Sequence, residues 1–465
     1  MSHITRISIK NYRGIKELTQ EFGKEKFVVL IGRGDSGKST ILSAIYAALS
    51  PSWNMMFSDL DFYKQDTDNP IEIEVTLNEL PIELLKESKF GLYIQTDPFE
   101  EVKQEDMSII IKLTVDSTFE PHWVVKARKN SDMEDKAISG ADRLLLAINF
   151  ITDCTDNQFA YNKQSPLYTL AKLQMKDGNT VEKVKSKLMR SLSESIKKEQ
   201  LESFNKPLEN FKNIAEKLGL NVNNLRAQID IQEDSYTGNS ITLHDNSIPY
   251  RLKGKGSKRL MSIAIQSELV EHGGIVLIDE LEQGLEPDRI ITLVRMLNDT
   301  TEGQVFITTH SLNVVLESEW HNIFIVNKGA KSLFVLDKEL DTCRRTNPEF
   351  LFAKKIICCQ GKKEFTFING LDTLAREKYN TSFLAKGVIV LNAGSRVKMF
   401  TYTDKLKYLG YDTCMFSDED TPEEPKETPE AEYSGSLFPS EDKETESKDK
   451  KEDIDALLRW CDIDV

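Results

Sequence analysis

Nine consecutive residues near the N-terminus combine glycines, a lysine and hydroxyl side chains in a spacing suited to a nucleoside triphosphate. They fit the pattern G-x-x-x-x-G-K-[ST] and are Gly32, Arg33, Gly34, Asp35, Ser36, Gly37, Lys38, Ser39 and Thr40. Glycines let main-chain N–H groups wrap around phosphates, Lys38 can reach the β- and γ-phosphates, and the Ser39 hydroxyl can ligate Mg²⁺. We expect this loop to bind ATP and Mg²⁺. Arg33 could help to hold phosphate or be a surface cation.

Two apolar runs further along the chain end in side chains that could act on the bound nucleotide. Residues 275–278 lead into Asp279 and Glu280, and residues 305–308 are followed closely by His310. Asp279 suits the outer shell of Mg²⁺, and Glu280 can act as the base that polarises the attacking water. His310 could sense the γ-phosphate, although a lone histidine after a strand is more often structural. The predicted catalytic residues are therefore Lys38, Glu280 and His310.

A second glycine-rich turn lies shortly before the first of these two runs. Residues 252–260 read LKGKGSKRL and lead into a helix expected from about residue 258 to residue 271, so Gly254, Gly256 and Ser257 are expected to face a phosphate at a helix N-terminus. The turn is similar to the signature loop of ABC-type ATPases, which contacts the γ-phosphate held by the opposite subunit, and residues 282–287 occupy the place of the D-loop. It departs from the usual L-S-G-G-Q. The order of motifs implies two heads that sandwich two ATP molecules, and hence a homodimer or a higher homo-oligomer.

The elements that must position these motifs follow from apolar patterning. Residues 27–31 form an apolar run before the first glycine-rich loop, and a helix is expected from about residue 38 to residue 49. Residues 71–77 and 108–115 alternate as strands do, whereas residues 169–218 are rich in Lys, Glu and Leu and are expected to be helical. From residue 355 a strand–helix–strand rhythm begins, which predicts a second α/β domain. The fold class expected is α/β.

The opening segment and the motif order together point to a known group of proteins. Residues 7–15, ISIKNYRGI, resemble the first strands of chromosome-maintenance-type ABC ATPases. Within that group the chain resembles the OLD family (overcoming lysogenisation defect), in which an ABC-type ATPase head with a helical dimerisation insert precedes a C-terminal TOPRIM nuclease. Relatives include anti-phage nucleases of Gabija and retron systems. The resemblance implies an ATP-controlled DNA endonuclease in anti-phage defence, with DNA and a retron or other defence protein as partners.

The TOPRIM-like match lies in the C-terminal region. Residues 356–364 resemble the strand that leads into E-G-x-x-E, residues 388–394 resemble the next strand and its turn, and residues 416–420 resemble the D-x-D element. The resemblance implies that Glu364, Asp418 and Asp420 hold Mg²⁺ or Mn²⁺, since clustered carboxylates suit these cations. Position 360 is Gln where that family has Glu, and an amide carries no charge and cannot act as a base. The chain also ends at what looks like the start of another strand, so the TOPRIM-like domain is expected to be incomplete.

The expected domain boundaries combine these observations. Residues 1–150 are expected to form the N-terminal ATPase lobe, residues 151–225 a helical dimerisation insert, residues 226–345 the C-terminal ATPase lobe, and residues 346–465 the TOPRIM-like domain. An acidic, Pro/Ser/Thr-rich stretch over residues 421–451 is expected to be a disordered loop. An alternative function is an ATPase switch whose inactive TOPRIM-like domain docks a separate effector protein. The helical insert and the C-terminal domain argue against the ATPase subunit of a transporter.

Composition limits the classes of protein that this chain can be. Its 465 residues carry a formal net charge of −15, with 60 basic and 75 acidic side chains. Residues 418–455 hold sixteen acidic and five basic side chains, so the rest of the chain carries only −4 and a DNA substrate is not excluded. Apolar runs are too short for a membrane span, the N-terminus lacks a signal peptide, and six cysteines without a CxxC pair exclude a disulfide framework. A cytoplasmic protein without a membrane partner is expected.

Overall fold

A computed structural model describes residues 2–95, 107–128, 132–152, 159, 165–166, 205–230, 240–246, 248–299, 302–417 and 454–463. The chain divides into two compact units, each described by itself. Unit 1 comprises Met1–Leu30, Asp35–Ser318 and Lys328–Leu333. Unit 2 comprises Ile31–Gly34, Glu319–Asn327 and Phe334–Val465. Most of the expected insert at 151–225 and all of the acidic loop at 421–451 lie outside the described residues.

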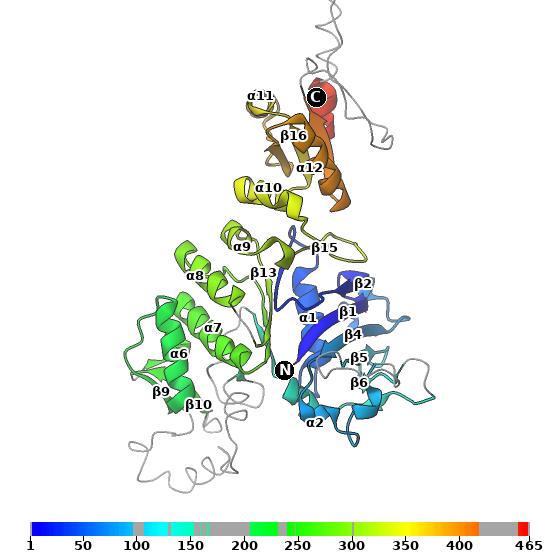
Figure 1. The fold of residues 1–465 in the computed structure, drawn as a ribbon, viewed down its shortest axis with the longest axis vertical. Helices are drawn as coiled ribbons and strands as arrows, with labels where there is room; N and C mark the ends of the chain where they lie inside the picture. Colours follow the sequence, from blue (N-terminus) through cyan, green and yellow to red (C-terminus); the bar gives the residue numbers. More distant parts are fainter. Residues whose placement is uncertain are drawn as a thin grey trace, which may run out of the picture. The chain divides into compact units, whose positions relative to one another are not determined.

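The helices and strands are labelled as in Figure 1. The helices are α1 (Lys38–Leu49), α2 (Ile82–Leu85), α3 (Gly140–Arg143), α6 (Asn205–Lys217), α7 (Lys255–Glu271), α8 (Pro287–Asn298), α9 (Leu312–Glu317), α10 (Asp341–Thr346), α11 (Lys362–Tyr379) and α12 (Arg396–Tyr408). The strands are β1 (His3–Tyr12), β2 (Ile15–Glu21), β3 (Phe27–Ile31), β4 (Ile71–Asn78), β5 (Ile109–Val115), β6 (Pro121–Val125), β7 (Lys136–Ala137), β8 (Ile148–Ile151), β9 (Leu225–Asp230), β10 (Ser240–Asp245), β11 (Ile248–Pro249), β12 (Ile275–Ile278), β13 (Gln304–Thr308), β14 (Ile323–Ile325), β15 (Phe334–Val335), β16 (Lys355–Cys359), β17 (Val388–Asn392) and β18 (Asp412–Phe416).

Unit 1 contains an antiparallel sheet and a parallel sheet with different burial. The antiparallel sheet has the order β2-β1-β4-β5-β6-β7, and β4 and β5 alternate buried and partly exposed residues, as expected for a sheet with one covered face. The parallel strands have the order β3-β13-β12-β8. β3, β12 and β13 are buried along their whole length, which explains their continuous apolar runs. The carboxyl ends of the parallel strands therefore meet at one edge.

Helix α1 joins the two sheets of unit 1. It contacts β4 and β5 of the antiparallel sheet as well as β8, β12 and β13 of the parallel sheet, and Figure 1 shows it lying between them. The predicted bounds of this helix, 38–49, are confirmed. On the other side of the parallel sheet, α7 packs against β8 and β12, and α6 packs against α7.

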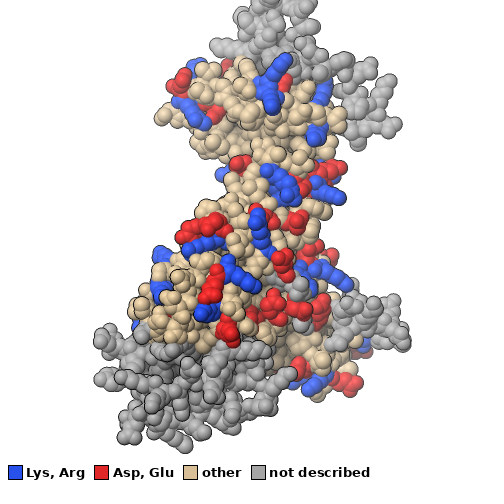
Figure 2. Space-filling view, turned by 60° about the vertical axis from the view of Figure 1, so that its left-hand side comes forward, with Lys and Arg blue, Asp and Glu red and all other residues tan. Residues whose placement is uncertain are grey.

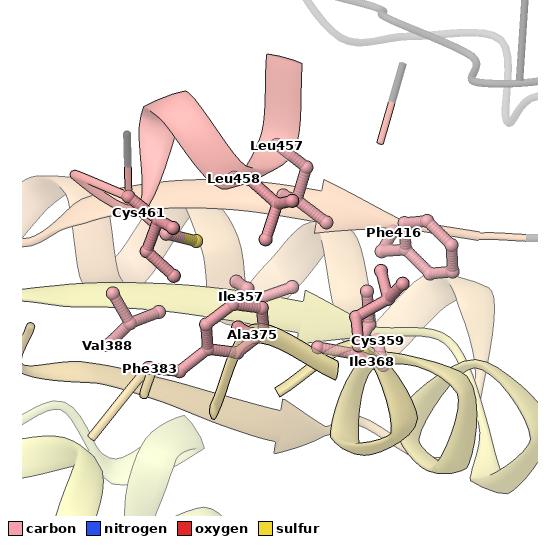
Figure 3. Close-up of a cluster of buried hydrophobic side chains, with 12 residues drawn as sticks. Ile357, Cys359, Ile368, Ala375, Phe383, Val388, Phe416, Leu457, Leu458 and Cys461 are labelled. Atoms are coloured by element: carbon pink, nitrogen blue, oxygen red, sulfur yellow. The ribbon is translucent and has the colours of Figure 1, made fainter. Parts of the chain in front are cut away.

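Unit 2 contains a small parallel sheet with the order β17-β16-β18. Helix α11 contacts β16 and β17, and α12 contacts β16 and β18. The helix formed by residues 454–460 adds Leu457 and Leu458 to the same apolar cluster as Ile357 of β16, as Figure 3 shows. The predicted strand at the end of the chain is therefore wrong within the described residues: residue 460 ends a helix, and a turn follows at residues 461–462.

No helix in the described part of the chain is long and apolar enough to cross a bilayer.

Candidate active site

The glycine-rich loop follows β3 directly and opens α1, as predicted. Gly32 and Gly37 have φ values of 150° and 106°, which side chains with a Cβ rarely adopt, and Asp35 is also left-handed at φ 57°. Gly37 is the N-cap of α1, so the helix begins at Lys38. The loop thus turns sharply and presents a helix N-terminus, the arrangement that binds phosphate.

The Lys38 side chain lies among carboxylates at the start of α1. The residue is only 6% exposed. Burial lowers the pKa of Lys38, and nearby carboxylates oppose that shift: Asp279, Glu280, Glu282 and Asp35. The residues predicted from three separate motifs are therefore brought together around this ammonium group.

Strand register explains how the carboxylates reach this place. Ile278 of β12 pairs with Ile307 of β13, so the next residues along, Asp279 and Thr308, lie level with each other. The Thr308 hydroxyl donates to Asp279 Oδ1 at 2.5 Å and accepts the main-chain N–H of Glu280 at 2.8 Å. The Ser39 hydroxyl donates to the same Asp279 oxygen at 2.9 Å. One continuous set of hydrogen bonds thus joins the glycine-rich loop to Glu280.

The donor atoms at this point fit a magnesium ion. The Ser39 hydroxyl and the Asp279 carboxylate are hard oxygen ligands that face each other at 2.9 Å. Mg²⁺ prefers oxygen ligands, and it usually takes only one or two from the protein while substrate phosphates supply others. The predicted metal role of Ser39 and Asp279 therefore suits the residues present.

Glu280 has a strained main chain. Its φ is 47°, in the left-handed region that a residue with a long side chain adopts at a cost. Such strain persists only where surrounding contacts hold it, and it is common at functional sites. The hydrogen bond from its N–H to Thr308 is one of those contacts.

His310 is held by a neighbouring carboxylate. Glu282 Oε1 accepts the main-chain N–H of His310 at 2.6 Å, and Glu282 Oε2 accepts the Thr309 hydroxyl at 2.7 Å. Burial lowers the pKa of His310, and the positive charge of Lys38 lowers it further. Both effects favour the neutral form of the imidazole, which lies close to the ammonium group that is predicted to bind phosphate.

The second glycine-rich turn forms the first turn of α7. The helix begins at Lys255, three residues before the predicted start, because Gly254 is its N-cap and its carbonyl already accepts the N–H of Lys258. An added Cβ on Gly256 would lie 2.9 Å from the carbonyl oxygen of Gly284, so this turn fits closely against the segment after β12. Gly254, Gly256 and Ser257 thus lie at a helix N-terminus, as predicted.

The predicted carboxylate site of unit 2 is only partly within the described residues. Gln360 follows β16, and its main-chain N–H donates to the carbonyl of Phe416 at the end of β18. Its Oε1 atom is buried and has no hydrogen-bond partner among the described residues, so it offers a neutral acceptor. The Glu364 carboxylate accepts the N–H of Gly361 at 2.9 Å and so caps α11.

The remaining ligands proposed for that site are not described. Asp418 and Asp420 lie outside the described residues, so the metal role of both stays a prediction. Among the residues that are described, no group of three His, Cys, Asp or Glu side chains is placed to hold a metal ion. The donor set present at the end of β16, one amide and one carboxylate already used as a cap, is therefore insufficient without those two residues.

Sequence reasoning missed two side chains that organise the active site. Thr308 and Glu282 lie inside motifs that were recognised, but their partners become apparent only when β12 and β13 are placed side by side. A polar side chain at the end of a buried parallel strand is the signal that could have found Thr308.

Comparison with known proteins identifies the family. A family model described as AAA ATPase domain (AAA_15) matches residues 3–315. A curated relative from Helicobacter pylori, named ATP/GTP phosphatase, is 24% identical over an alignment of 356 residues that covers 66% of this chain and 85% of the relative.

Two solved structures are also similar to this chain. An SMC head domain from Pyrococcus furiosus, with an extended coiled coil and bound to the C-terminal domain of ScpA, is 16% identical. It covers 75% of this chain and 99% of its own, with a TM-score of 0.47. The recombination mediator protein RecF with ATP is 15% identical and covers 72% of this chain and 99% of its own, with a TM-score of 0.43. OLD-family membership and the TOPRIM domain stay predictions. Since the family model spans more than half of the chain, this protein belongs to the AAA ATPase domain family and is a P-loop ATPase.

Proposed function

We propose that the chain hydrolyses ATP at the edge where β3, β12 and β13 end, as the head of an ABC-type ATPase. The observation that supports this most directly is the hydrogen-bonded set that joins Ser39, Asp279, Thr308 and Glu280 beside the buried Lys38. It brings a phosphate-binding cation, a metal-binding pair of oxygens and a candidate base to one place.

Each of these residues has a distinct role in the proposed reaction. Lys38 and the main-chain N–H groups of Gly32–Thr40 bind the phosphates and offset their charge. Mg²⁺ held by Ser39, with Asp279 behind it, would neutralise charge that develops on the phosphate oxygens. The Glu280 carboxylate accepts a proton from the attacking water, and neutral His310 forms a hydrogen bond with the terminal phosphate.

Phosphate release from the purified chain tests this proposal. Lys38→Ala should abolish ATP binding, because the remaining loop lacks the cation that holds the phosphates. Glu280→Gln should bind and retain ATP but hydrolyse it at least roughly a hundredfold more slowly. Lys86→Ala and Glu83→Gln, both exposed at helix α2, are the matched controls. Turnover of Glu280→Gln equal to wild type would contradict the role of the base.

The choice of nucleotide is part of the same test. The Helicobacter pylori relative is named an ATP/GTP phosphatase, so GTP is the competitor to examine. The proposed roles of these residues all concern phosphates and Mg²⁺, which ATP and GTP share. Phosphate release should therefore be measured with each nucleotide in turn, and inhibition by the other nucleotide should be measured as well.

We further propose that nucleotide turnover controls a TOPRIM-like DNA endonuclease in unit 2, with a role in anti-phage defence. The parallel sheet β17-β16-β18 and the polar residues after its strands support this reading. Residues 334–417 also carry fourteen basic and nine acidic side chains, unlike the chain as a whole. Figure 2 shows Lys and Arg exposed on this unit, and such side chains can bind a phosphate backbone.

A second candidate is an ATPase switch whose unit 2 docks a separate effector protein. Gln360 at the position of a family carboxylate, and Glu364 used as a helix cap, favour it. Plasmid nicking with Mg²⁺ or Mn²⁺, by wild type and by Gln360→Glu, separates the two candidates. Plasmid nicking whose rate changes in Lys38→Ala supports the nuclease. If neither protein nicks the plasmid and the chain captures a neighbouring gene product, the result supports the docking function.

A further inference from the structure

Arg259 in α7 is a buried arginine that has no role in the proposed reaction as described above. It is only 3% exposed. One terminal nitrogen of its guanidinium donates to the carbonyl of Thr152 at 3.2 Å. The other donates to the carbonyls of Asp279 at 2.5 Å and Glu280 at 2.9 Å. All three acceptors are main-chain oxygens.

These acceptors lie where two parallel strands have just ended. Thr152 follows β8 and Asp279 follows β12, and the two strands are paired in parallel. Beyond the end of a strand, carbonyl groups lose their ladder partners, and a buried carbonyl without a donor costs free energy. A planar guanidinium with several fixed donors can serve such carbonyls together, whereas a lysine ammonium is a point charge.

The same contact holds Glu280 in its strained conformation. The main-chain N–H of Glu280 donates to the Thr308 hydroxyl, and its carbonyl accepts from Arg259. Side chains therefore hold both main-chain polar groups of this residue, whose φ is 47°. The direction of a side chain depends on its own φ and ψ. The Glu280 carbonyl also accepts the main-chain N–H of Gln283 at 3.0 Å. The position of the Glu280 carboxylate therefore depends on Arg259 together with this turn and Thr308.

Arg259 also belongs to the first two turns of the helix that begins at the second glycine-rich loop. It lies three residues after Gly256, hence on the neighbouring turn of one rigid helix. Gly256 itself fits against the carbonyl of Gly284, in the segment that follows Glu280. Two separate contacts thus connect the start of α7 with residues 279–284.

We propose that Arg259 is a positioning residue that links the N-terminus of α7 to the proposed base Glu280. A phosphate bound at Gly254–Ser257 shifts the start of α7, and Arg259 transmits this shift to the main chain of Glu280. The inference rests on the proposed ATP hydrolysis and adds how one site of the head influences another.

Kinetics of Arg259→Met and Arg259→Lys test the proposal. Methionine keeps the apolar stem but removes every donor, so kcat should fall at least about tenfold. The KM for ATP should change by less than about twofold, because Lys38 and the loop are untouched. Lysine keeps the positive charge but lacks the several fixed donors of the guanidinium group, so Arg259→Lys should give an intermediate kcat. Arg295→Met removes an exposed arginine of α8 and is the matched control.

A double mutant separates positioning from loss of stability. If Arg259 acts through Glu280, Arg259→Met should reduce the kcat of Glu280→Gln by much less than it reduces that of wild type. Equal losses in both backgrounds, or an unchanged kcat in Arg259→Met and Arg259→Lys, would overturn the inference alone. If Arg259→Met does not fold, a wild-type kcat in Arg259→Lys with a lowered melting temperature would overturn it. Wild-type hydrolysis that Glu280→Gln does not reduce would overturn the proposed function as well.

Discussion

Thr308 has two hydrogen-bonding roles with a single hydroxyl group. It donates to the carboxylate of Asp279 and accepts from the N–H of Glu280, so it fixes both residues relative to each other. The residue is 1% exposed, which leaves no water to replace these bonds. At the scale of single residues, the site therefore depends on a side chain that is not expected to touch nucleotide.

Thr308→Val should impair hydrolysis and stability together. Valine has nearly the same shape but leaves the Glu280 N–H unpaired and removes a donor from Asp279. A buried group left without its partner costs about 1–3 kcal/mol, and kcat should fall by roughly tenfold or more. Urea unfolding and phosphate release measure the two effects. Thr308→Ser keeps the hydroxyl and should retain most activity; equal losses in both variants would show that the methyl group, and not the hydroxyl, matters.

The site residues divide according to how far apart their partners lie in the chain. Lys38, Ser39, Asp279 and Glu280 could be predicted because each belongs to a short motif with its own strand or helix. The role of Thr308 could not, because it depends on the register of β12 against β13. Arg259 was likewise hidden, since its acceptors are main-chain carbonyls, which no sequence pattern marks.

At the scale of elements, strong local signals gave accurate bounds and weak ones did not. The helix at 38–49 and the strand at 275–278 were predicted with their observed ends, because a glycine loop and acidic residues delimit them. Helix α7 starts earlier than predicted, since a lysine- and glycine-rich sequence can continue a helix once Gly254 caps it. The helix at 454–460 was missed because its apolar face is completed by residues far away in the sequence, such as Ile357.

The attachment of that last helix should depend on pH. Asp462 is bonded to Lys354 and Lys355 at 2.8 Å each, and these hydrogen bonds lower the pKa of Asp462 to about 2. A carboxyl group whose pKa is lower in the folded state than in the unfolded state stabilises the folded state at pH values above the unfolded pKa of about 4. This stabilisation disappears as the pH falls toward 2. Asp462→Asn should therefore loosen the segment at neutral pH and have little effect near pH 2.

Hydrogen exchange of residues 454–463 can measure this difference. At pH 7 the exchange of Asp462→Asn should be faster than that of wild type, and the ratio should shrink as both are compared at lower pH. Asp412→Asn, an exposed carboxylate at the start of β18, is the control. A ratio that stays constant down to pH 2 would contradict the assignment to these ion pairs.

At the scale of the whole molecule, the charge is divided unevenly along the chain. Residues 418–455 account for −11 of the formal −15, whereas residues 334–417 carry +5. The negative net charge of the whole chain therefore does not apply to residues 334–417 of unit 2, which are net positive. Interaction of DNA with its basic side chains should weaken steeply with salt, because counterions compete for the phosphates.

If two heads pair as proposed, two variants that are each inactive should recover ATP hydrolysis when they form a mixed dimer. If Ser257 of one chain faces the phosphate held by Lys38 of another, Ser257→Arg damages the signature half of a site and Lys38→Ala damages the loop half. Each variant alone should be inactive. A mixed dimer would then contain one intact site, so chains produced together in equal amounts should recover about a quarter of wild-type activity. Phosphate release from co-expressed, co-purified chains measures this recovery.

The control for that experiment combines two defects on the same half of the site. Lys38→Ala and Glu280→Gln both affect the head that holds the nucleotide by its loop, so a mixed dimer of these variants has no intact site and should stay inactive. Recovery with Ser257→Arg but not with Glu280→Gln requires that the start of α7 act on a nucleotide bound to another chain. If neither mixture recovers, hydrolysis is completed within a single chain, and the N-terminus of α7 influences Glu280 only through Arg259.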